Sequence, residues 1–224
     1  MIPFKPKDDS PAAENPKQSI LYETLWRKDE PLNGHSAYFF ATNDRANPGS
    51  FRNVSVGPDP KAQLASLQQP GVDLYFACAV YADANSRTAR NALGAYGFWM
   101  DIDCGQAKAD AGQGYATVAE GRKALSRFCE KAGIPYPNAI VNSGSGIHAH
   151  WILDRFLPKD EWQAATRQLK DLCKALGFLA DPSRTADIAS VLRIPGTLNY
   201  KTDPAKPVTL IHWDPKLIEV RHAG

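Results

Sequence analysis

Two aspartates one residue apart, Asp101 and Asp103, follow the apolar run 96–100 and have the residue type and spacing of a metal site. Because a strand directs alternate side chains to one face, the two carboxylates are expected to project side by side. Such a pair resists joint ionisation unless a cation lies between its members, and Mg²⁺ or Mn²⁺ prefers oxygen ligands. The alternative is a solvated strand end that leads into a turn at Gly105.

A glycine-serine turn followed by two histidines lies in residues 142–151. The backbone N–H groups of such a turn can face a phosphate, and the hydroxyls of Ser143 and Ser145 add donors. His148 and His150 share one strand face because they are two residues apart. The alternative is an ordinary hairpin whose second strand is half-buried.

The stretch from Asp181 to Lys201 places one acid before two spaced cations around a Pro-Gly turn. Arg193 offers a planar fork of donors and Lys201 a point charge, and both suit a polyphosphate. The alternative is a surface loop that happens to contain two cations.

The composition indicates an ordered globular chain without excluding nucleic acid as a partner. The chain has 224 residues, 43% of them hydrophobic, and a net charge of +2, which suits one large domain or two small lobes. No apolar run approaches the roughly 20 residues of a membrane helix, and the N-terminal residues lack a hydrophobic signal core. We therefore expect a cytoplasmic protein with no membrane partner.

The four cysteines are too far apart in the sequence to form a zinc knuckle. Cys78, Cys129 and Cys173 lie in apolar surroundings and are expected to be reduced core residues. Cys104, beside the aspartate pair, is expected to be more exposed.

Hydrophobic periodicity and turn residues predict interleaved helices and strands, and therefore an α+β protein with mixed sheets. Thr117 and Glu120 form a capping box that opens one helix, and Gly133 ends it. Residues 1–17 show no periodicity and are expected to form a loose arm. The predicted helices are 18–28, 58–69, 117–132 and 158–176, and the predicted strands are 37–42, 52–56, 72–81, 94–102, 138–142, 147–153 and 208–213.

Three segments in this order resemble the motifs of the archaeo-eukaryotic primase superfamily, over about residues 70–213. They are the apolar strand ending in Asp-x-Asp at 98–103, the small-residue turn ending in His at 143–148, and the stretch 179–201 with Leu192-Arg193-Ile194-Pro195-Gly196. The closest similarity is to primase-polymerase domains of plasmids, phages and other mobile elements. Two departures are Ser190, where the family often has a cation, and His150, which we interpret as a structural histidine.

The resemblance implies a two-module core. The expected modules are an N-terminal α/β unit at about 18–93 and a unit like an RNA-recognition motif at about 94–215, with a mixed or antiparallel sheet. Residues 216–224 would be a tail, so the chain resembles a domain cut from a longer protein. Such domains often precede a helicase domain, which is therefore an expected partner.

The activity implied is that of a DNA primase or DNA polymerase, a template-dependent nucleotidyltransferase of DNA replication that uses Mg²⁺ or Mn²⁺. By this resemblance Asp101, Asp103 and Asp181 hold two metal ions. Asp187 competes with Asp181 for that role, but is interpreted as a cap because Asp181 opens the motif after an apolar lead-in. The substrates would be a single-stranded DNA template and an NTP or dNTP, and the residues expected to bind the nucleotide are Ser143, Ser145, His148, Arg193 and Lys201.

Two other functions remain open at this point. His148, Ala149 and His150 also fit the His-hydrophobe-His pattern of metal-dependent DNA nickases, with Tyr200 as the candidate nucleophile. A non-catalytic nucleic-acid module would need only aromatic residues on a sheet. A template groove could be lined by the residues ahead of the first motif, namely Tyr75, Arg87, Arg90 and Asn91.

Overall fold

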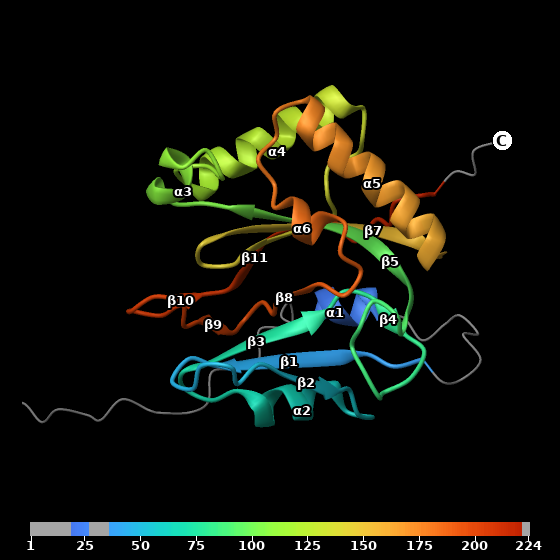
Figure 1. The fold of residues 1–224 in the computed structure, drawn as a ribbon, viewed down its shortest axis with the longest axis vertical. Helices are drawn as coiled ribbons and strands as arrows, with labels where there is room; N and C mark the ends of the chain where they lie inside the picture. The colour runs from blue at the N-terminus through green and yellow to red at the C-terminus, as the bar shows by residue number, and fades with distance from the viewer. Residues whose placement is uncertain (1–18, 27–35, 221–224) are drawn as a thin grey trace, which may run out of the picture.

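Two antiparallel sheets form the frame of the molecule in the computed structural model, which describes residues 19–26 and 36–220 (Figure 1). The first sheet has the order β2 (Arg52–Ser55), β1 (Phe39–Asp44), β3 (Val72–Ala77) and β8 (Val191–Arg193). The second has the order β11 (Thr209–Trp213), β6 (Ala139–Asn142), β7 (Gly146–Pro158), β5 (Ala92–Asp103) and β4 (Val80–Tyr81). A separate two-stranded ladder joins β9 (Leu198–Asn199) to β10 (Lys206–Pro207).

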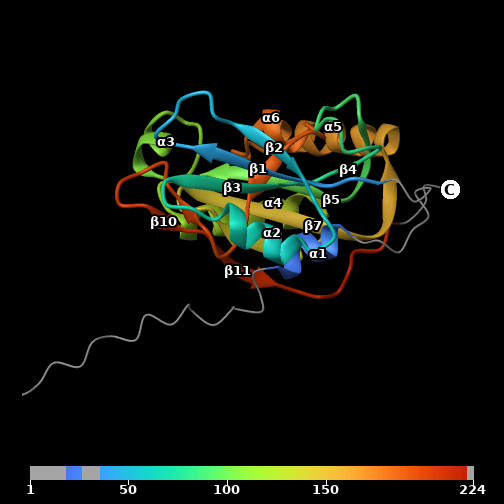
Figure 2. The ribbon, with the colours of Figure 1, turned by 90° about the horizontal axis from the view of Figure 1, so that it is seen from below.

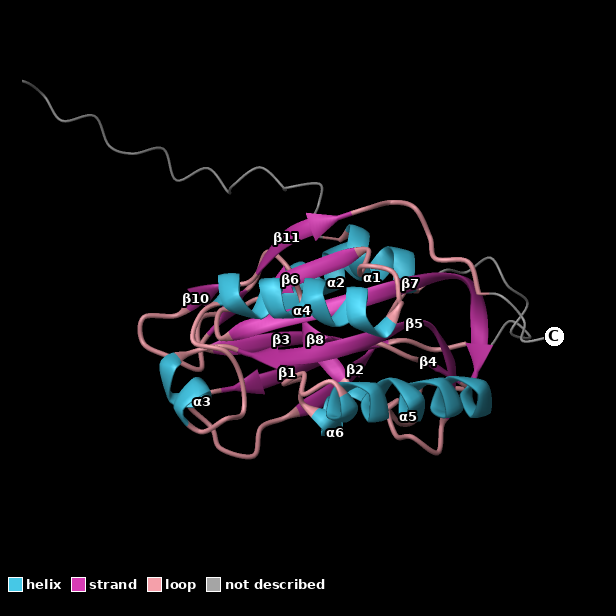
Figure 3. Cartoon of the chain, turned by 90° about the horizontal axis from the view of Figure 1, so that it is seen from above, coloured by secondary structure: helices cyan, strands magenta, loops and turns pink. Residues whose placement is uncertain are grey.

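Helices cover the outer side of the second sheet and one face of the first. The described helices are α1 (Ile20–Leu25), α2 (Pro60–Leu67), α3 (Gln106–Asp110), α4 (Val118–Ala132), α5 (Lys159–Ala175) and α6 (Pro182–Thr185). The first sheet lies below the second in Figure 1, and α4 and α5 lie above it. Figure 3 shows α4 over β6 and β7 and α5 along the side of β5. The α+β class is as predicted, and the ladders between named strands are all antiparallel.

Most predicted elements are present, with shifted ends. The predicted arm at 1–17, part of the helix at 18–28 and part of the tail at 216–224 lie outside the described residues. None of the helices described in residues 19–26 and 36–220 is long and apolar enough to cross a membrane.

The capping box predicted for α4 is confirmed in detail. The Thr117 hydroxyl accepts the N–H of Glu120 at 3.1 Å, and the Glu120 carboxylate accepts the N–H of Ala116 at 3.2 Å. Gly133 closes the helix in the left-handed region with φ 65°, a conformation that glycine adopts without steric cost. This helix is therefore fixed by local sequence signals at both ends.

The single strand predicted at 72–81 is wrong, because the chain crosses there from one sheet to the other. β3 ends at Ala77 and belongs to the first sheet, whereas β4 belongs to the second. The Cys78 N–H between them donates to the carbonyl of Ser190 at 3.2 Å. Since β8 lies in the first sheet, the predicted boundary at residue 93 does not separate the two sheets. Periodicity alone could not show that one apolar run serves two sheets.

The open edge of β5 is covered by α5 and α6, which explains their position. The indole N–H of Trp162 donates to the carbonyl of Gly97 at 2.9 Å, and the N–H of Asp181 donates to the carbonyl of Asp101 at 2.7 Å. The rings of Trp99 and Trp162 lie 4.8 Å apart. Buried backbone carbonyls that lack a ladder partner must find other donors, and these two helices supply them.

Gly97 should tolerate no side chain, because a Cβ there would lie 2.7 Å from the carbonyl oxygen of Trp151 and 3.1 Å from a methyl group of Leu25. We expect Gly97→Ala to destabilise the protein by about 1–3 kcal/mol, as overpacking does, and thermal unfolding will measure it. Gly57→Ala is the matched control, since its Cβ would meet only Gln63 at 3.7 Å. Equal melting temperatures of the two variants would contradict the packing described for β5.

Candidate active site

The pairing of β5 with β7 brings the first two predicted motifs together. Asp101 lies opposite His148 and Asp103 opposite Gly146. Partners in an antiparallel ladder point to the same face, so both carboxylates and His148 share one face, as the sequence predicted. The Nε2 atom of His148 lies 3.7 Å from Oδ1 of Asp101.

The backbone of Asp181 is hydrogen-bonded to that of Asp101. Its N–H donates to the carbonyl of Asp101, which fixes the start of α6 against β5. Its carboxylate accepts the N–H of Ser183 at 2.8 Å and the Ser183 hydroxyl at 2.6 Å. Burial alone would raise the pKa of Asp181, but these hydrogen bonds and the charge of Arg184 hold it below the usual value. The third predicted acid is therefore ionised beside the other two.

Asp101 is the electrostatic focus of the site. Burial and the nearby charges of Asp103 and Asp181 raise the pKa of Asp101 to about 7, although Arg184 and Lys201 act in the opposite direction. Its side chain is still 27% exposed. A buried carboxylate with two like-charged neighbours holds its charge only when a cation compensates it, and such groups occur preferentially at functional sites.

Lys108 is a cation of the site that the sequence analysis missed. Its Nζ atom lies 2.8 Å from Oδ2 of Asp103, and that hydrogen bond raises the pKa of Lys108. Lys108 belongs to α3, a helix of five residues that no pattern predicted. Periodicity needs a longer window than one turn, so no sequence pattern indicated this pair.

The donor set fits a hard divalent ion in its chemistry, but the three acids are not yet gathered around one point. Among the residues that the structure describes, no three His, Cys, Asp or Glu side chains lie close enough together to hold a metal. Asp101 and Asp103 supply adjacent carboxylates on one face of the sheet. The Asp181 carboxylate would have to leave Ser183 to join them.

The glycine-serine turn is tight, and part of its donor set is used internally. Gly144 has φ 86°, and its N–H donates to the side chain of Asn142 at 2.9 Å, while the Ser143 N–H donates to Gly146. The Asn199 amide donates to the carbonyl of Ser143 at 2.7 Å and to the hydroxyl of Ser145 at 3.3 Å. Asn199 from the third motif thus holds the turn of the second in place.

His148 and His150 share a face, and both are neutral in the fold. Burial, with the charges of His150 and Arg193, lowers the pKa of His148 well below the usual value, and burial lowers that of His150 to about 3. The ring of His150 stacks on Phe76 at 5.9 Å and is fully buried. This packing supports the interpretation of His150 as a structural histidine and gives no support to a nickase that would use both histidines as ligands.

Arg193 is engaged with a buried aspartate, Asp73. Its Nη1 lies 2.8 Å from Oδ1 of Asp73, and its Nη2 donates to Oδ2 at 3.0 Å. Burial alone would raise the pKa of Asp73, but the bonds from Arg193 and from the N–H of Tyr200 lower it below the usual value. The contact of Arg193 with a nucleotide therefore stays a prediction. An acid within the apolar strand was the signal for this pair, because a buried charge needs a partner.

Lys201 lies near the acids, whereas Asp187 is engaged in a local turn. Lys201 is exposed, and its charge is close enough to lower the pKa of Asp101. Asp187 accepts the N–H of Ala189 at 2.9 Å in a local turn, which agrees with a capping role rather than a metal ligand.

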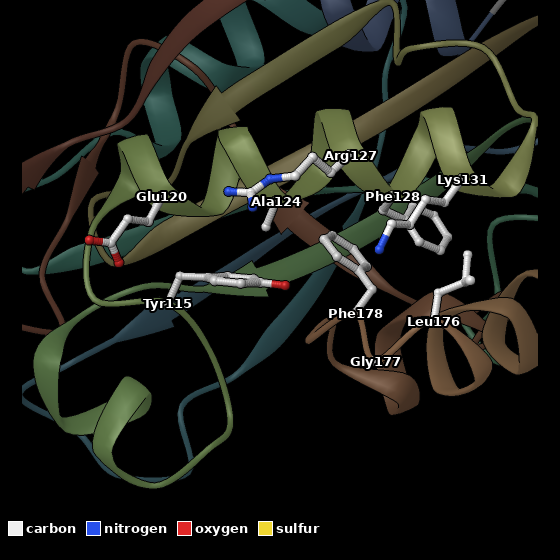
Figure 4. Close-up of a pocket in the computed structure, with 9 residues that line it drawn as sticks. All are labelled: Tyr115, Glu120, Ala124, Arg127, Phe128, Lys131, Leu176, Gly177 and Phe178. Atoms are coloured by element: carbon white, nitrogen blue, oxygen red, sulfur yellow. The ribbon is translucent and has the colours of Figure 1, made fainter.

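A pocket of about 380 Å³ lies elsewhere, between α4 and the loop after α5, and contains none of the predicted site residues (Figure 4). The rings of Phe128 and Phe178 stack there at 4.5 Å, and the Tyr115 hydroxyl accepts the N–H of Leu179 at 3.1 Å. Its lining is Tyr115, Glu120, Ala124, Arg127, Phe128, Lys131, Leu176, Gly177 and Phe178.

Two solved structures share the arrangement of this chain. The primase-polymerase (PrimPol) AEP domain of cyanophage S-2L superposes with a TM-score of 0.62 over 92% of this chain and 94% of its own, at 16% identity. The chain has the fold of an archaeo-eukaryotic primase-polymerase domain. The primase RepB' gives a TM-score of 0.52 at 15% identity, over 81% of this chain and 52% of its own. No family model and no curated protein matches the sequence.

The position of the acids within this primase-polymerase fold gives a prediction about stability. The folded state binds the proton of Asp101 more tightly than the unfolded state does, so its ionisation destabilises the fold as the pH rises from about 4 to about 7. We expect Asp101→Asn to melt several degrees higher than the wild type above pH 7 without divalent ions.

Added Mn²⁺ should then raise the melting temperature of the wild type and not that of Asp101→Asn, because binding to the native state stabilises it. Asp171→Asn, an exposed change on α5, is the control. A lower melting temperature of Asp101→Asn at pH 8, or equal stabilisation of both proteins by Mn²⁺, would contradict this account.

Proposed function

We propose that this chain is a template-dependent nucleotidyltransferase that acts as a DNA primase or DNA polymerase in the replication of a plasmid, phage or other mobile element. The observation that carries the proposal is the position of Asp101 and Asp103 on one face of β5, with Asp181 hydrogen-bonded to the backbone of Asp101 and Lys201 nearby, in a primase-polymerase fold. The two similar structures, a cyanophage primase-polymerase domain and a primase, support the same class of reaction and context.

The reaction joins the 3′-oxygen of a primer to the α-phosphorus of a nucleotide and releases pyrophosphate. Two Mg²⁺ or Mn²⁺ ions held by the three acids would activate the 3′-hydroxyl and stabilise the leaving group. The residues of this chain position the substrates and balance their charge. Asp101 and Asp103 bring the negative charge that holds the cations, and Asp181 joins them once its carboxylate leaves Ser183.

His148 and Lys201 are the residues proposed to bind the triphosphate. The buried His148 ring is neutral and can donate one N–H, because burial lowers its pKa. Lys201 is exposed and adds a full positive charge. The hydroxyls of Ser143 and Ser145 lie in the turn held by Asn199, and Arg193 anchors the segment that leads to Lys201 through its pair with Asp73.

The second sheet is proposed to be the module like an RNA-recognition motif. Its chain order β5, α4, β6, β7, α5 and β11 alternates strands and helices as the split βαβ motif does. The choice between NTP and dNTP and the association with a helicase stay predictions.

Replacing either acid of β5 should abolish the activity while the fold persists. We expect Asp101→Asn and Asp103→Asn to reduce primer extension with Mg²⁺ or Mn²⁺ at least about 100-fold, because each removes a group that stabilises the transition state electrostatically. Extension of a labelled primer on a single-stranded template measures this.

Asp171→Asn on α5 is the matched control, since it removes an equal charge far from the site. An Asp101→Asn variant that extends the primer as well as this control does would refute the proposal. De novo synthesis without a primer, measured in the same assay, separates a primase from a polymerase.

A further inference from the structure

One face of the first sheet carries a row with polar or charged side chains on three of its four strands. The pairing of β2, β1, β3 and β8 places Asn53, Ala41, Tyr75 and Arg193 in one row. The next row, on the other face, is apolar and packs on α1 through ring contacts of Phe40 with Tyr22 and Trp26. Its members are Val54, Phe40, Phe76 and Leu192. Figure 2 shows α1 and α2 together at one side of this sheet, so the polar row lies on the face turned away from α1.

Two aromatic rings in contact, with a cation at each end, form a ladder along this row. The guanidinium of Arg193 lies 4.9 Å from the ring centre of Tyr75, and the Tyr75 ring lies 6.1 Å from that of Phe51. The guanidinium of Arg87 lies 5.7 Å from the ring centre of Phe51. Cations over ring faces are favourable, so each member of the ladder fixes the next.

The outer end of the ladder is exposed but held in place. Phe51 is 42% exposed, which is unusual for a phenylalanine in contact with a sheet. The Nε of Arg87 donates to the side chain of Asn53 at 2.6 Å, and Arg87 also donates to the carbonyl of Ala189. Among the described residues, no carboxylate forms a salt bridge with Arg52, Arg87 or Arg90.

A hollow of about 510 Å³ adjoins the ladder. It is lined by the exposed side of β2 and by the loop that holds Arg87. Asn91, one of the residues suggested for a template groove, instead braces this loop by donating to the carbonyls of Asp83 and Ser86. The lining consists almost entirely of hydrogen-bonding side chains: Phe39, Arg52, Asn53, Ser55, Ala84, Asn85, Ser86, Arg87 and Thr88.

The ladder is continuous with the candidate active site. Its buried end, Arg193, is close enough to His148 to lower the pKa of that ring. Its partner Asp73 also accepts the N–H of Tyr200 at 2.8 Å, next to Lys201. The buried end of the ladder therefore lies close to His148 and to the segment that leads to Lys201.

We propose that this face, the ladder of Arg193, Tyr75, Phe51 and Arg87 with its adjacent hollow, binds the single-stranded part of the DNA template. The exposed ring of Phe51 offers a stacking surface for an unpaired base, and the cation of Arg87 beside it can compensate a phosphate. Arg52, Arg90 and the polar lining of the hollow suit the sugar-phosphate backbone. The proposal deepens the proposed function and rests on it for the identity of the strand.

Fluorescence anisotropy with a labelled twelve-residue oligothymidylate tests this, together with an abasic oligomer of equal length, both in EDTA. We expect Phe51→Ala and Arg87→Ala to weaken oligothymidylate binding at least about fivefold, as loss of stacking does. Phe51→Ala should change the affinity for the abasic oligomer by less than about twofold. Phe51→Trp should bind oligothymidylate with the affinity of the wild type.

Leu176→Ala and Arg167→Ala, exposed changes on the α5 side, are the matched controls and should bind as the wild type does. Because Arg87 also holds its loop in place, the thermal unfolding of each variant is measured. If Arg87→Ala is unstable, the result for Phe51→Ala alone tests the proposal. Wild-type affinity of a folded Phe51→Ala variant would overturn the proposal, as would equal losses for both oligomers.

Primer extension by the wild type, run in parallel, separates this proposal from the proposed function. If oligothymidylate binding depends on Phe51 but the wild type extends no primer, the DNA-binding role of the ladder is supported and the proposed polymerase activity is refuted. If the wild type extends the primer and Phe51→Ala equals it in both binding and extension, only the DNA-binding role of the ladder is refuted.

Discussion

The hydrogen bond from the Asp181 N–H to the carbonyl of Asp101, 2.7 Å long, is the contact on which the candidate site depends. Asp101 lies on the long strand β5, and Asp181 lies 80 residues later in the sequence, at the start of α6. The open edge of β5 needs donors for its carbonyls, and α6 supplies one. Closing this edge brings a third acid to a pair that already repels itself.

The same arrangement has a cost in the free protein. Burial and its two acidic neighbours raise the pKa of Asp101 to about 7, and Lys108 forms its salt bridge with Asp103. The hydrogen bonds that hold α5 and α6 on β5 keep Asp101 and Asp181 close together despite this repulsion. A cation bound by the acids would relieve this repulsion. A triphosphate bound by His148 and Lys201, as proposed, would lie next to that cation.

Local signals in the sequence predicted the parts that depend on nearby residues. The capping box predicted the start of α4 at Thr117 and Gly133 its end, and the period-two spacing correctly placed Asp101 and Asp103 on one face of a strand and His148 and His150 on one face of another. Long-range pairings were beyond these signals. The Asp73–Arg193 pair joins residues 120 positions apart, and the break after Ala77 depends on which sheet each half enters.

The candidate site shows the same division. The three acids could be named from their motifs, but Lys108 lies on a helix too short for periodicity, and the distance of Asp181 from the other two depends on how α6 packs on β5. The pairing of Arg193 with Asp73 is likewise a property of the packed sheet, because the two residues lie on different strands.

A crystal structure with Mn²⁺, a primer-template and a non-hydrolysable nucleotide tests the central claim most directly. Anomalous scattering should locate Mn²⁺ in contact with carboxylate oxygens of Asp101 and Asp103, with the Asp181 carboxylate moved from Ser183 toward the ion and the triphosphate beside His148 and Lys201. Manganese bound away from Asp101 and Asp103, or a triphosphate on another face of the molecule, would contradict the account.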